Sequence, residues 1–382
     1  MHRLRHQGVS MRVLRNTISV SWQRHSQCLR RIAATAEVPF TLSPKATFTY
    51  KNHLYADHLA LLERYKAEVL AASKEAREPA EQSHASESAA KSFAKQQREH
   101  AEQRRELAEQ KRQIGATMRD PAKKAAFQAA VKEYQEQFNH RVAIEVRNGR
   151  ELTDAGMDTS GFVLLKHASL VEDWDDTEQV HRTYYEEMRS LVQRLTGASR
   201  CYVNRHNIRK SDGSTTFPPF LEVHSDFTDS YKEALVRSLR TGTEETPTFG
   251  MLDQLQSDGV TVEELSSSRL LVIHAWRSVS DAPLRKFPLA LCDGRTVGEK
   301  ELIREKVSGL ERYRATHSPL HRWYWFPDMV KDEVMLFKGF DSEHKRYAFH
   351  SAFVHPDTST DDAHRFSCEL RLLCLIPKTA TP

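Results

Sequence analysis

Short apolar runs recur in the second half of the chain, and polar or turn-forming stretches separate them. The runs lie at residues 200–208, 220–224, 269–277, 333–340, 347–355 and 365–376. Two earlier runs, 140–146 and 161–167, have the same character. Short apolar runs bounded by turn residues are typical of β-strands. With few helical stretches between them, the pattern predicts a mainly β fold with flanking helices, built as an antiparallel sandwich or barrel.

Helical spacing of apolar residues is confined to a few segments. One amphipathic stripe lies between Asp175, in a cluster typical of a helix start, and Gly197, a residue typical of a helix stop. Residues 231–239 and 299–312 are also predicted to be helical. Residues 53–72 repeat apolar side chains at helical intervals and predict an amphipathic helix. These stripes indicate packing against a core and carry no chemistry.

The N-terminal third is more polar than the rest of the chain. Residues 79–113 contain only two sizeable apolar side chains, Phe93 and Leu107, so the segment cannot bury enough surface to offset the entropy of folding. Its composition favours a solvated helical spacer, and a partner-binding arm is the alternative. We therefore divide the chain into a basic tail (1–36), a helical, charged extension or insertion (37–137) and a β domain (138–382).

The basic tail combines seven arginines with no acidic residue. This composition resembles a mitochondrial transit peptide, and a disordered basic tail or an over-long gene model are the alternatives. The expected location is therefore cytoplasmic or mitochondrial.

Charge, cysteines and missing motifs exclude several classes of protein. The net charge is only +4, from 56 basic and 52 acidic residues, which does not favour a nucleic-acid partner. No apolar run approaches the ~18 residues of a membrane-spanning helix. The five cysteines are scattered without a CxxC pair, so neither a zinc ribbon nor a disulfide framework is predicted. GxGxxG and GxxxxGK(S/T) are absent, which argues against a nucleotide-binding fold of either kind.

A His-x-Asp pair, His224 and Asp226, ends one predicted strand. If the strand continues through both residues, alternation points them to the same side, where they can share a metal ion. Two imidazoles and one carboxylate are the ligands of a ferrous oxygenase, so a distant histidine is required. His350, His355 and His364 compete for this place, and strand parity favours His350 because His355 begins a turn-rich stretch.

Arg365 and Ser367 share one face of the last predicted strand. A buried arginine is costly unless an anion meets it, and its planar fork suits the distal carboxylate of a dicarboxylate cosubstrate. A salt bridge with Glu369 or an edge position is the alternative for Arg365. Arg371 has the same parity and is a second candidate or a structural partner.

Three further residues are candidates for substrate binding. Trp276 and Arg277 follow a strand that runs into the predicted barrel, and Arg277 could bind a substrate carboxylate or pair with an acid such as Asp293. Trp323 belongs to an aromatic cluster that could form a substrate wall, although such clusters are more often part of a core.

Several blocks of sequence, in this order, resemble the AsaB/CmcJ-like hydroxylase and desaturase proteins, which include gibberellin desaturase-like members. The blocks are TGA (196–198), VHSDF (223–227), HAWR (274–277), FPLALCDGRTV (287–297), HRWYWFPDMVKDEVMLFKGFDS (321–342), HSAFVHPDT (350–358) and RFSCELR (365–371). The resemblance covers about residues 138–378. One departure is His274-Ala275, where the family usually shows asparagine-valine.

The resemblance implies a double-stranded β-helix (jelly-roll) core and a dioxygenase that uses Fe(II), 2-oxoglutarate and O2 to hydroxylate or desaturate a small organic metabolite, with release of succinate and CO2. It assigns the metal to His224, Asp226 and His350, and the 2-oxoglutarate carboxylate to Arg365 and Ser367. The expected partner is a small-molecule substrate, with a carboxylate-bearing one among the candidates. A zinc-dependent hydrolase with the same ligands and a non-catalytic jelly-roll protein are the alternatives.

Overall fold

The computed structural model describes residues 45–52, 54–60, 136–215, 218–244, 251–307, 310–344 and 347–377, with six single positions between 63 and 129. The basic tail and residues 79–113 lie outside the described residues, so both assignments stay predictions. Of the helix predicted for residues 53–72, the structure describes a helical stretch at 54–60. Among the described residues, no helix is long and apolar enough to cross a membrane.

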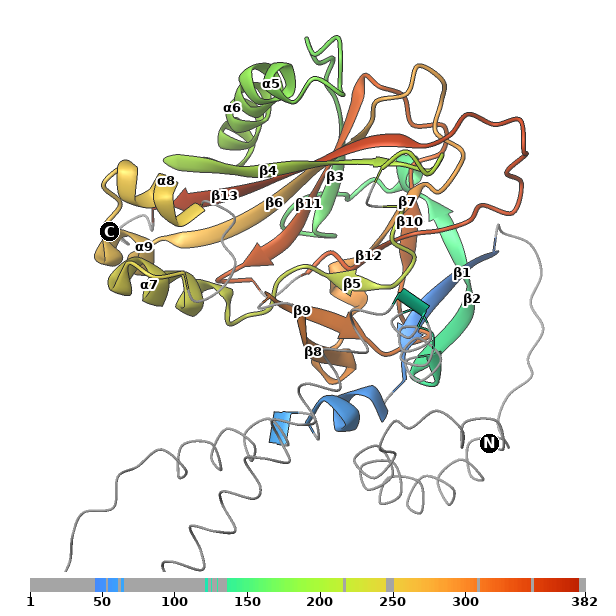
Figure 1. Cartoon of the computed structure of the whole chain (residues 1–382), viewed down its shortest axis with the longest axis horizontal. Coiled ribbons are helices and arrows are strands. Elements are labelled where there is room, and N and C mark those ends of the chain that lie inside the picture. The colour runs from blue at the N-terminus through green and yellow to red at the C-terminus, as the bar shows by residue number, and fades with distance from the viewer. Residues whose placement is uncertain are drawn as a thin grey trace, which may run out of the picture. The chain divides into compact units, whose positions relative to one another are not determined.

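Two β-sheets form the body of the protein (Figure 1). In spatial order, the five-stranded sheet contains β3 (Phe162–Lys166), β11 (Glu333–Asp341), β6 (Arg269–Ser278), β13 (Phe366–Ile376) and β4 (Arg200–Lys210), all antiparallel. The eight-stranded sheet contains β1 (Lys45–Lys51), β2 (Asn139–Asn148), β10 (Trp323–Trp325), β7 (Leu289–Cys292), β12 (His350–Ala352), β5 (His224–Ser225), β9 (Leu310–Ala315) and β8 (Leu302–Val307). Its β10–β2 pair is parallel. The predicted mainly β fold is confirmed.

The two sheets share an interior. Trp276 and Phe337 from the five-stranded sheet pack in one buried cluster with Leu291 and Tyr324 from the eight-stranded sheet. Successive side chains of a strand face opposite sides, so each strand of the five-stranded sheet also has an outer face. That outer face packs against a helical layer made of α5 (Thr177–Gln179), the π-helical segment η3 (Val180–Tyr184) and α6 (Tyr185–Thr196).

The ends of this helical layer lie close to where the sequence placed them. Asp176 caps the start, because its side chain accepts hydrogen bonds from the backbone N–H groups of Glu178 and Gln179. Gly197 ends α6 with a φ of 69°, a left-handed conformation that glycine adopts without steric cost. The other helices are α7 (Tyr231–Thr241), α8 (Met251–Ser257), α9 (Val262–Ser267) and the short 3-10 segments η2 (Gly149–Glu151), η4 (Gly294–Thr296) and η5 (Glu299–Glu301).

The helix predicted for residues 299–312 is wrong, because most of this segment is the β8–β9 hairpin. Its Glu, Lys and Arg residues favour a helix in isolation, but tertiary contacts override that weak preference. Glu305 is buried on the hairpin, where it bonds Arg312 on the facing strand, Arg314 and the hydroxyl of Tyr55. These cross-strand ion pairs form only when the segment is extended.

Strand β1 lies in the range for which the sequence predicted a helical, charged extension (37–137). It pairs with β2 along its whole length, and Thr49 accepts a hydrogen bond from the backbone of Val223, next to His224. The ring of Phe48 is fully buried and lies 4.5 Å from that of Trp323 on β10. Residues 45–51 are therefore part of the β domain, and the boundary at residue 138 is too late.

We expect Phe48→Ala to lower the free energy of unfolding by about 3–5 kcal/mol, because it leaves a cavity against Trp323. Thr47→Ala is the control: Thr47 is exposed on the same strand, and its truncation should change stability by less than about 0.5 kcal/mol. Urea unfolding of the full chain measures both. Equal stabilities of the two variants would show that β1 does not belong to the domain.

Candidate metal centre

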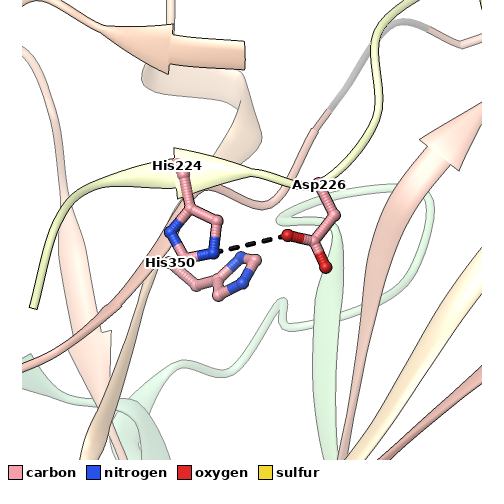
Figure 2. A group of neighbouring side chains, drawn as sticks. All are labelled: His224, Asp226 and His350. Atoms are coloured by element: carbon pink, nitrogen blue, oxygen red, sulfur yellow. Dashed lines mark ion pairs between the residues drawn. The ribbon is translucent and has the colours of Figure 1, made fainter. Parts of the chain in front are cut away.

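Three of the residues singled out in the sequence lie together between the two sheets. His224 on β5 pairs directly with His350 on β12, and Asp226 follows β5 (Figure 2). One ligand atom from each residue lies within 4.8 Å of the others. The two imidazole centroids are 4.2 Å apart, and Nε2 of His224 is 3.4 Å from Oδ1 of Asp226. His364 and His355 do not belong to this group.

Backbone carbonyls orient both imidazoles. Nδ1 of His224 lies 2.8 Å from the carbonyl oxygen of Glu222, and Nδ1 of His350 lies 3.1 Å from that of Ala348. Because a carbonyl oxygen only accepts, each Nδ1 carries the proton and each Nε2 keeps its lone pair. A lone pair that faces a carboxylate oxygen is repelled unless a cation lies between them. The arrangement therefore fits a metal ion.

Burial and charge hold His350 and Asp226 in the protonation states that a metal requires. Burial, reinforced by the neighbouring His224, lowers the pKa of His350 to about 3, so its imidazole is neutral near pH 7. Burial alone would raise the pKa of Asp226. The guanidinium of Arg371 and the adjacent imidazoles outweigh burial and hold that pKa well below its usual range. The neutral imidazole of His350 and the carboxylate of Asp226 are thus available as ligands.

Arg365 and Ser367 form a candidate anion site on the same face of β13. The side chain of Arg365 is 2% exposed, and its Nε donates to Oγ of Ser367 at 2.9 Å. Its Nη1 donates to the carbonyl of Phe287, and its guanidinium lies 5.1 Å from the ring centroid of Trp276. No salt bridge of Arg365 with an acid occurs among the described residues. Burial, with a contribution from Arg209, lowers its pKa to about 9. A bound anion would offset the cost of burying this positive charge.

Only one of the three predicted substrate-binding residues faces this interior. Trp276 lies on the inner face of β6, beneath Arg365. Arg277 points to the opposite face, where it bonds the carbonyl of His167 and lies 5.0 Å from the ring centroid of Tyr184. Since neighbouring residues of a strand face opposite sides, Arg277 cannot bind a substrate held beside Trp276. Its predicted role there is wrong, as is its suggested pairing with Asp293, which bonds Arg295.

Trp323 is also misplaced for substrate binding. It packs against β1, where its ring contacts that of Phe48 and its Nε1 donates to the hydroxyl of Tyr50 at 2.7 Å. Its neighbour Tyr324 faces the interior instead and packs in the cluster that contains Trp276. Trp323 is thus a core residue, which was the alternative left open by the sequence.

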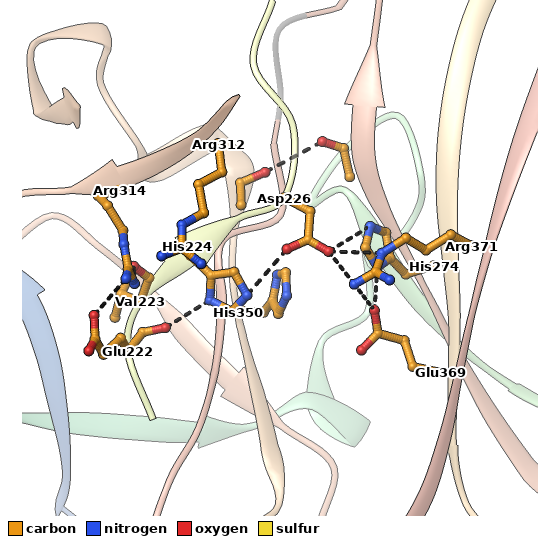
Figure 3. A network of polar contacts seen from close by, with 12 residues as sticks. Glu222, Val223, His224, Asp226, His274, Arg312, Arg314, His350, Glu369 and Arg371 are labelled. Atoms are coloured by element: carbon orange, nitrogen blue, oxygen red, sulfur yellow. Dashed lines mark hydrogen bonds and ion pairs between the residues drawn. The ribbon is translucent and has the colours of Figure 1, made fainter. Parts of the chain in front are cut away.

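A second group of polar residues lies beside Asp226; the sequence pointed to Arg371 and Glu369 singly but did not group them with Asp226 and His274. One ligand-type atom each of Asp226, His274 and Glu369 lies within 4.8 Å of the others, and Arg371 contacts both carboxylates (Figure 3). Parity placed Arg371 on the face of Arg365 and Ser367, and Glu369 continues the same alternation. Polar side chains repeated along one face of an otherwise apolar strand are the signal.

Comparisons with known proteins show which proteins this chain resembles. A family model described as "Oxidoreductase/YMDC permease-like domain" matches residues 114–375. The chain is 27% identical to the alpha-ketoglutarate-dependent dioxygenase phiK of a fungal species, over 58% of this chain and 79% of that protein. It is 28% identical to the hydroxylase/desaturase efuI of Hormonema carpetanum, over 52% of this chain and 71% of that protein.

A solved structure is also similar. It is the iron and alpha-ketoglutarate-dependent endoperoxidase NvfI, with 25% identity and a TM-score of 0.52, over 63% of this chain and 87% of that one. The match confirms the predicted fold class, mainly β with a double-stranded β-helix core. The relatives confirm the resemblance to hydroxylase and desaturase proteins.

We expect Gly339→Ala to disturb this centre, because a Cβ at Gly339 would lie 2.4 Å from Nε2 of the buried His274. The imidazole must move away from Glu369, and the free energy of unfolding should fall by about 1–3 kcal/mol. Gly298→Ala is the control, since the nearest atom to a Cβ there is 3.6 Å away. Urea unfolding measures both variants, and a Gly339→Ala protein as stable as Gly298→Ala would contradict the close packing.

Proposed function

Because the chain belongs to the oxidoreductase/YMDC permease-like domain family, we propose that His224, Asp226 and His350 hold its catalytic Fe(II) ion. The protein is an Fe(II)/2-oxoglutarate-dependent dioxygenase, an oxidoreductase that hydroxylates or desaturates a small organic molecule with release of succinate and CO2. The relatives are named dioxygenases and hydroxylase/desaturases, so the zinc-dependent hydrolase and the non-catalytic jelly-roll protein are not supported.

The observation that carries the ligand assignment is the convergence of the three side chains. Two residues that pair across β5 and β12 and one that follows β5 bring their ligand atoms within 4.8 Å, with both Nε2 lone pairs available. Three ligands of this kind on one side of an ion leave positions open for the cosubstrate and O2. Iron, when bound, supplies the activation of O2 through oxidative decarboxylation of 2-oxoglutarate.

The proposed task of the remaining residues is binding and orientation. Arg365, with Ser367 beside it, binds the distal carboxylate of 2-oxoglutarate, because a buried guanidinium without an acidic partner among the described residues needs an anion. Trp276 packs against that guanidinium and limits its movement. The suggestion of a carboxylate on the substrate rested on Arg277, which faces the helical layer. The proposal is therefore confined to a small organic substrate.

The ligand assignment predicts different results for two histidines that are five residues apart. Anaerobic titration of the wild type with Fe(II) and 2-oxoglutarate should produce a weak visible charge-transfer band. His350→Ala should abolish the band, because an alanine supplies no ligand, whereas His355→Ala should keep it. Circular dichroism shows that each variant is folded. A band lost in His355→Ala and kept in His350→Ala would refute the assignment.

The anion site predicts that Arg365→Gln weakens 2-oxoglutarate binding by about 2 kcal/mol, roughly a 30-fold rise in Kd, because a charged hydrogen bond is lost. 2-Oxobutyrate provides the control, since it keeps the keto acid and lacks the distal carboxylate. Wild type should strongly prefer 2-oxoglutarate, and the variant should lose most of this preference. Titration of the Fe(II) protein with each keto acid measures both constants. An unchanged preference in the variant would place the carboxylate elsewhere.

A further inference from the structure

A buried row of polar side chains adjoins the proposed iron ligands on one side. Glu369 and Arg371 project from the inner face of β13, and His274 projects from the neighbouring β6, where it pairs in register with Arg371. Figure 3 shows these three side chains around the carboxylate of Asp226. His274 is fully buried, and the side chains of Glu369 and Arg371 are 9% and 15% exposed. The row therefore lies in an environment where water screens charges weakly.

The contacts of this row are directed at one atom of Asp226. Arg371 donates from Nε and Nη2 to Oδ2 of Asp226, at 2.9 and 2.5 Å. The other oxygen, Oδ1, is the one that lies 3.4 Å from Nε2 of His224. The two oxygens of this carboxylate thus have different partners: Oδ2 faces the guanidinium of Arg371, and Oδ1 faces the imidazole of His224.

Arg371 is itself held in place. Its Nη2 lies 2.8 Å from Oε1 of Glu369, and that oxygen also lies 3.0 Å from Nδ1 of His274. The imidazole of His274 stacks on Phe337 with centroids 4.6 Å apart, and it occupies space left by the missing side chain of Gly339. β13 lies between β6 and β4; Glu369 pairs with both neighbours, and Arg371 pairs with His274 of β6 at a point where the pairing with β4 shifts register. Such support keeps a side chain in one orientation.

Two interpretations account for a second group of metal-ligand types at this place. Asp226, His274 and Glu369 have suitable atoms within 4.8 Å of one another, which is compatible with a second cation. Arg371 argues against this, because its guanidinium already lies between the two carboxylates, at 2.5 Å from one and 2.8 Å from the other. A second cation there would meet both a positive charge and oxygens that already accept hydrogen bonds.

We propose that Arg371, held by Glu369, which His274 also contacts, is a positioning residue that occupies Oδ2 of Asp226 and leaves Oδ1 alone for the iron. This inference rests on the proposed function. A carboxylate with both oxygens free can take two positions on an ion, whereas one with a blocked oxygen takes one. Arg371 thereby preserves a coordination position for the cosubstrate or O2.

The test is titration of the metal-free protein with Co(II), followed by its visible absorption, in wild type and in Arg371→Gln. We expect affinity to fall by about 10- to 100-fold, as is typical when a hydrogen-bond partner of a metal ligand is removed. The spectrum at saturation should also change, because Asp226 can then bind through both oxygens and alter the coordination number. Arg371→Lys keeps the charge without the planar fork, so its affinity should be intermediate.

Arg269→Gln is the matched control. Arg269 also binds a buried carboxylate through two nitrogens, with Nε and Nη2 at 3.1 and 2.7 Å from the oxygens of Asp341, but its partner lies outside both groups of metal-ligand residues. Its loss should lower stability as much as the loss of Arg371 while leaving Co(II) affinity and spectrum as in wild type. If Arg371→Gln fails to fold, Arg371→Lys and Glu369→Gln, which removes the charge that holds Arg371, still test the proposal.

Different outcomes would refute the positioning role of Arg371 and the proposed dioxygenase function. Wild-type affinity and spectrum in the folded Arg371 and Glu369 variants would overturn the positioning role. Two Co(II) ions per wild-type chain, reduced to one in His274→Ala, would also overturn it in favour of a second metal. A wild-type protein that shows no charge-transfer band with Fe(II) and 2-oxoglutarate would instead refute the proposed function, whatever the variants do.

Discussion

Charge buried between two sheets is costly unless each group meets a partner, and this constraint organises the interior of the protein. The inner face of β13 carries Arg365, Ser367, Glu369 and Arg371 in succession, and all but Arg371 are less than a tenth exposed. Arg371 is neutralised by two carboxylates. Arg365 has no such partner among the described residues, and in the proposed function the dicarboxylate cosubstrate supplies the missing charge. Under that proposal, one strand links metal geometry with cosubstrate recognition.

The register of the strands brings the candidate metal ligands together. The direct pairing of His224 with His350 brings together residues 126 positions apart, and it does so without a dedicated loop. The carbonyls that orient both imidazoles come from the residues two positions earlier in each chain segment, so the same backbone that pairs the strands also selects the protonated nitrogen. The placement of the two imidazoles is thus a consequence of β-pairing, whereas Asp226 lies in a bend just after β5 and is held by Arg371.

The N-terminal strand and the helical layer support the sheets from two sides. β1 extends the eight-stranded sheet and bonds the backbone beside His224, while its Phe48 packs on Trp323. On the other sheet, η3 and α6 cover the outer face of β6, where Arg277 lies close to Tyr184. Each tryptophan-containing motif thus contributes to two places. Trp276 of HAWR and Tyr324 of HRWYWF pack in the interior cluster, whereas Arg277 and Trp323 pack against the helical layer and β1.

The sequence by itself determined every strand of the five-stranded sheet, together with β2, β5 and β12, and the parity of each side chain within these strands. Parity is local, so it identified His350 rather than His355 and grouped Arg365 with Ser367. Which face of a strand meets the interior is not local. Arg277 and Trp323 have plausible positions in sequence, yet Arg277 packs on the outer face of β6 beside the helical layer and Trp323 packs in the cluster of Phe48, apart from that of Trp276. The β8–β9 hairpin and the contacts of Arg371 with Asp226 were decided only by the tertiary structure, because their partners are distant in the chain and their energies arise only when both partners are buried together.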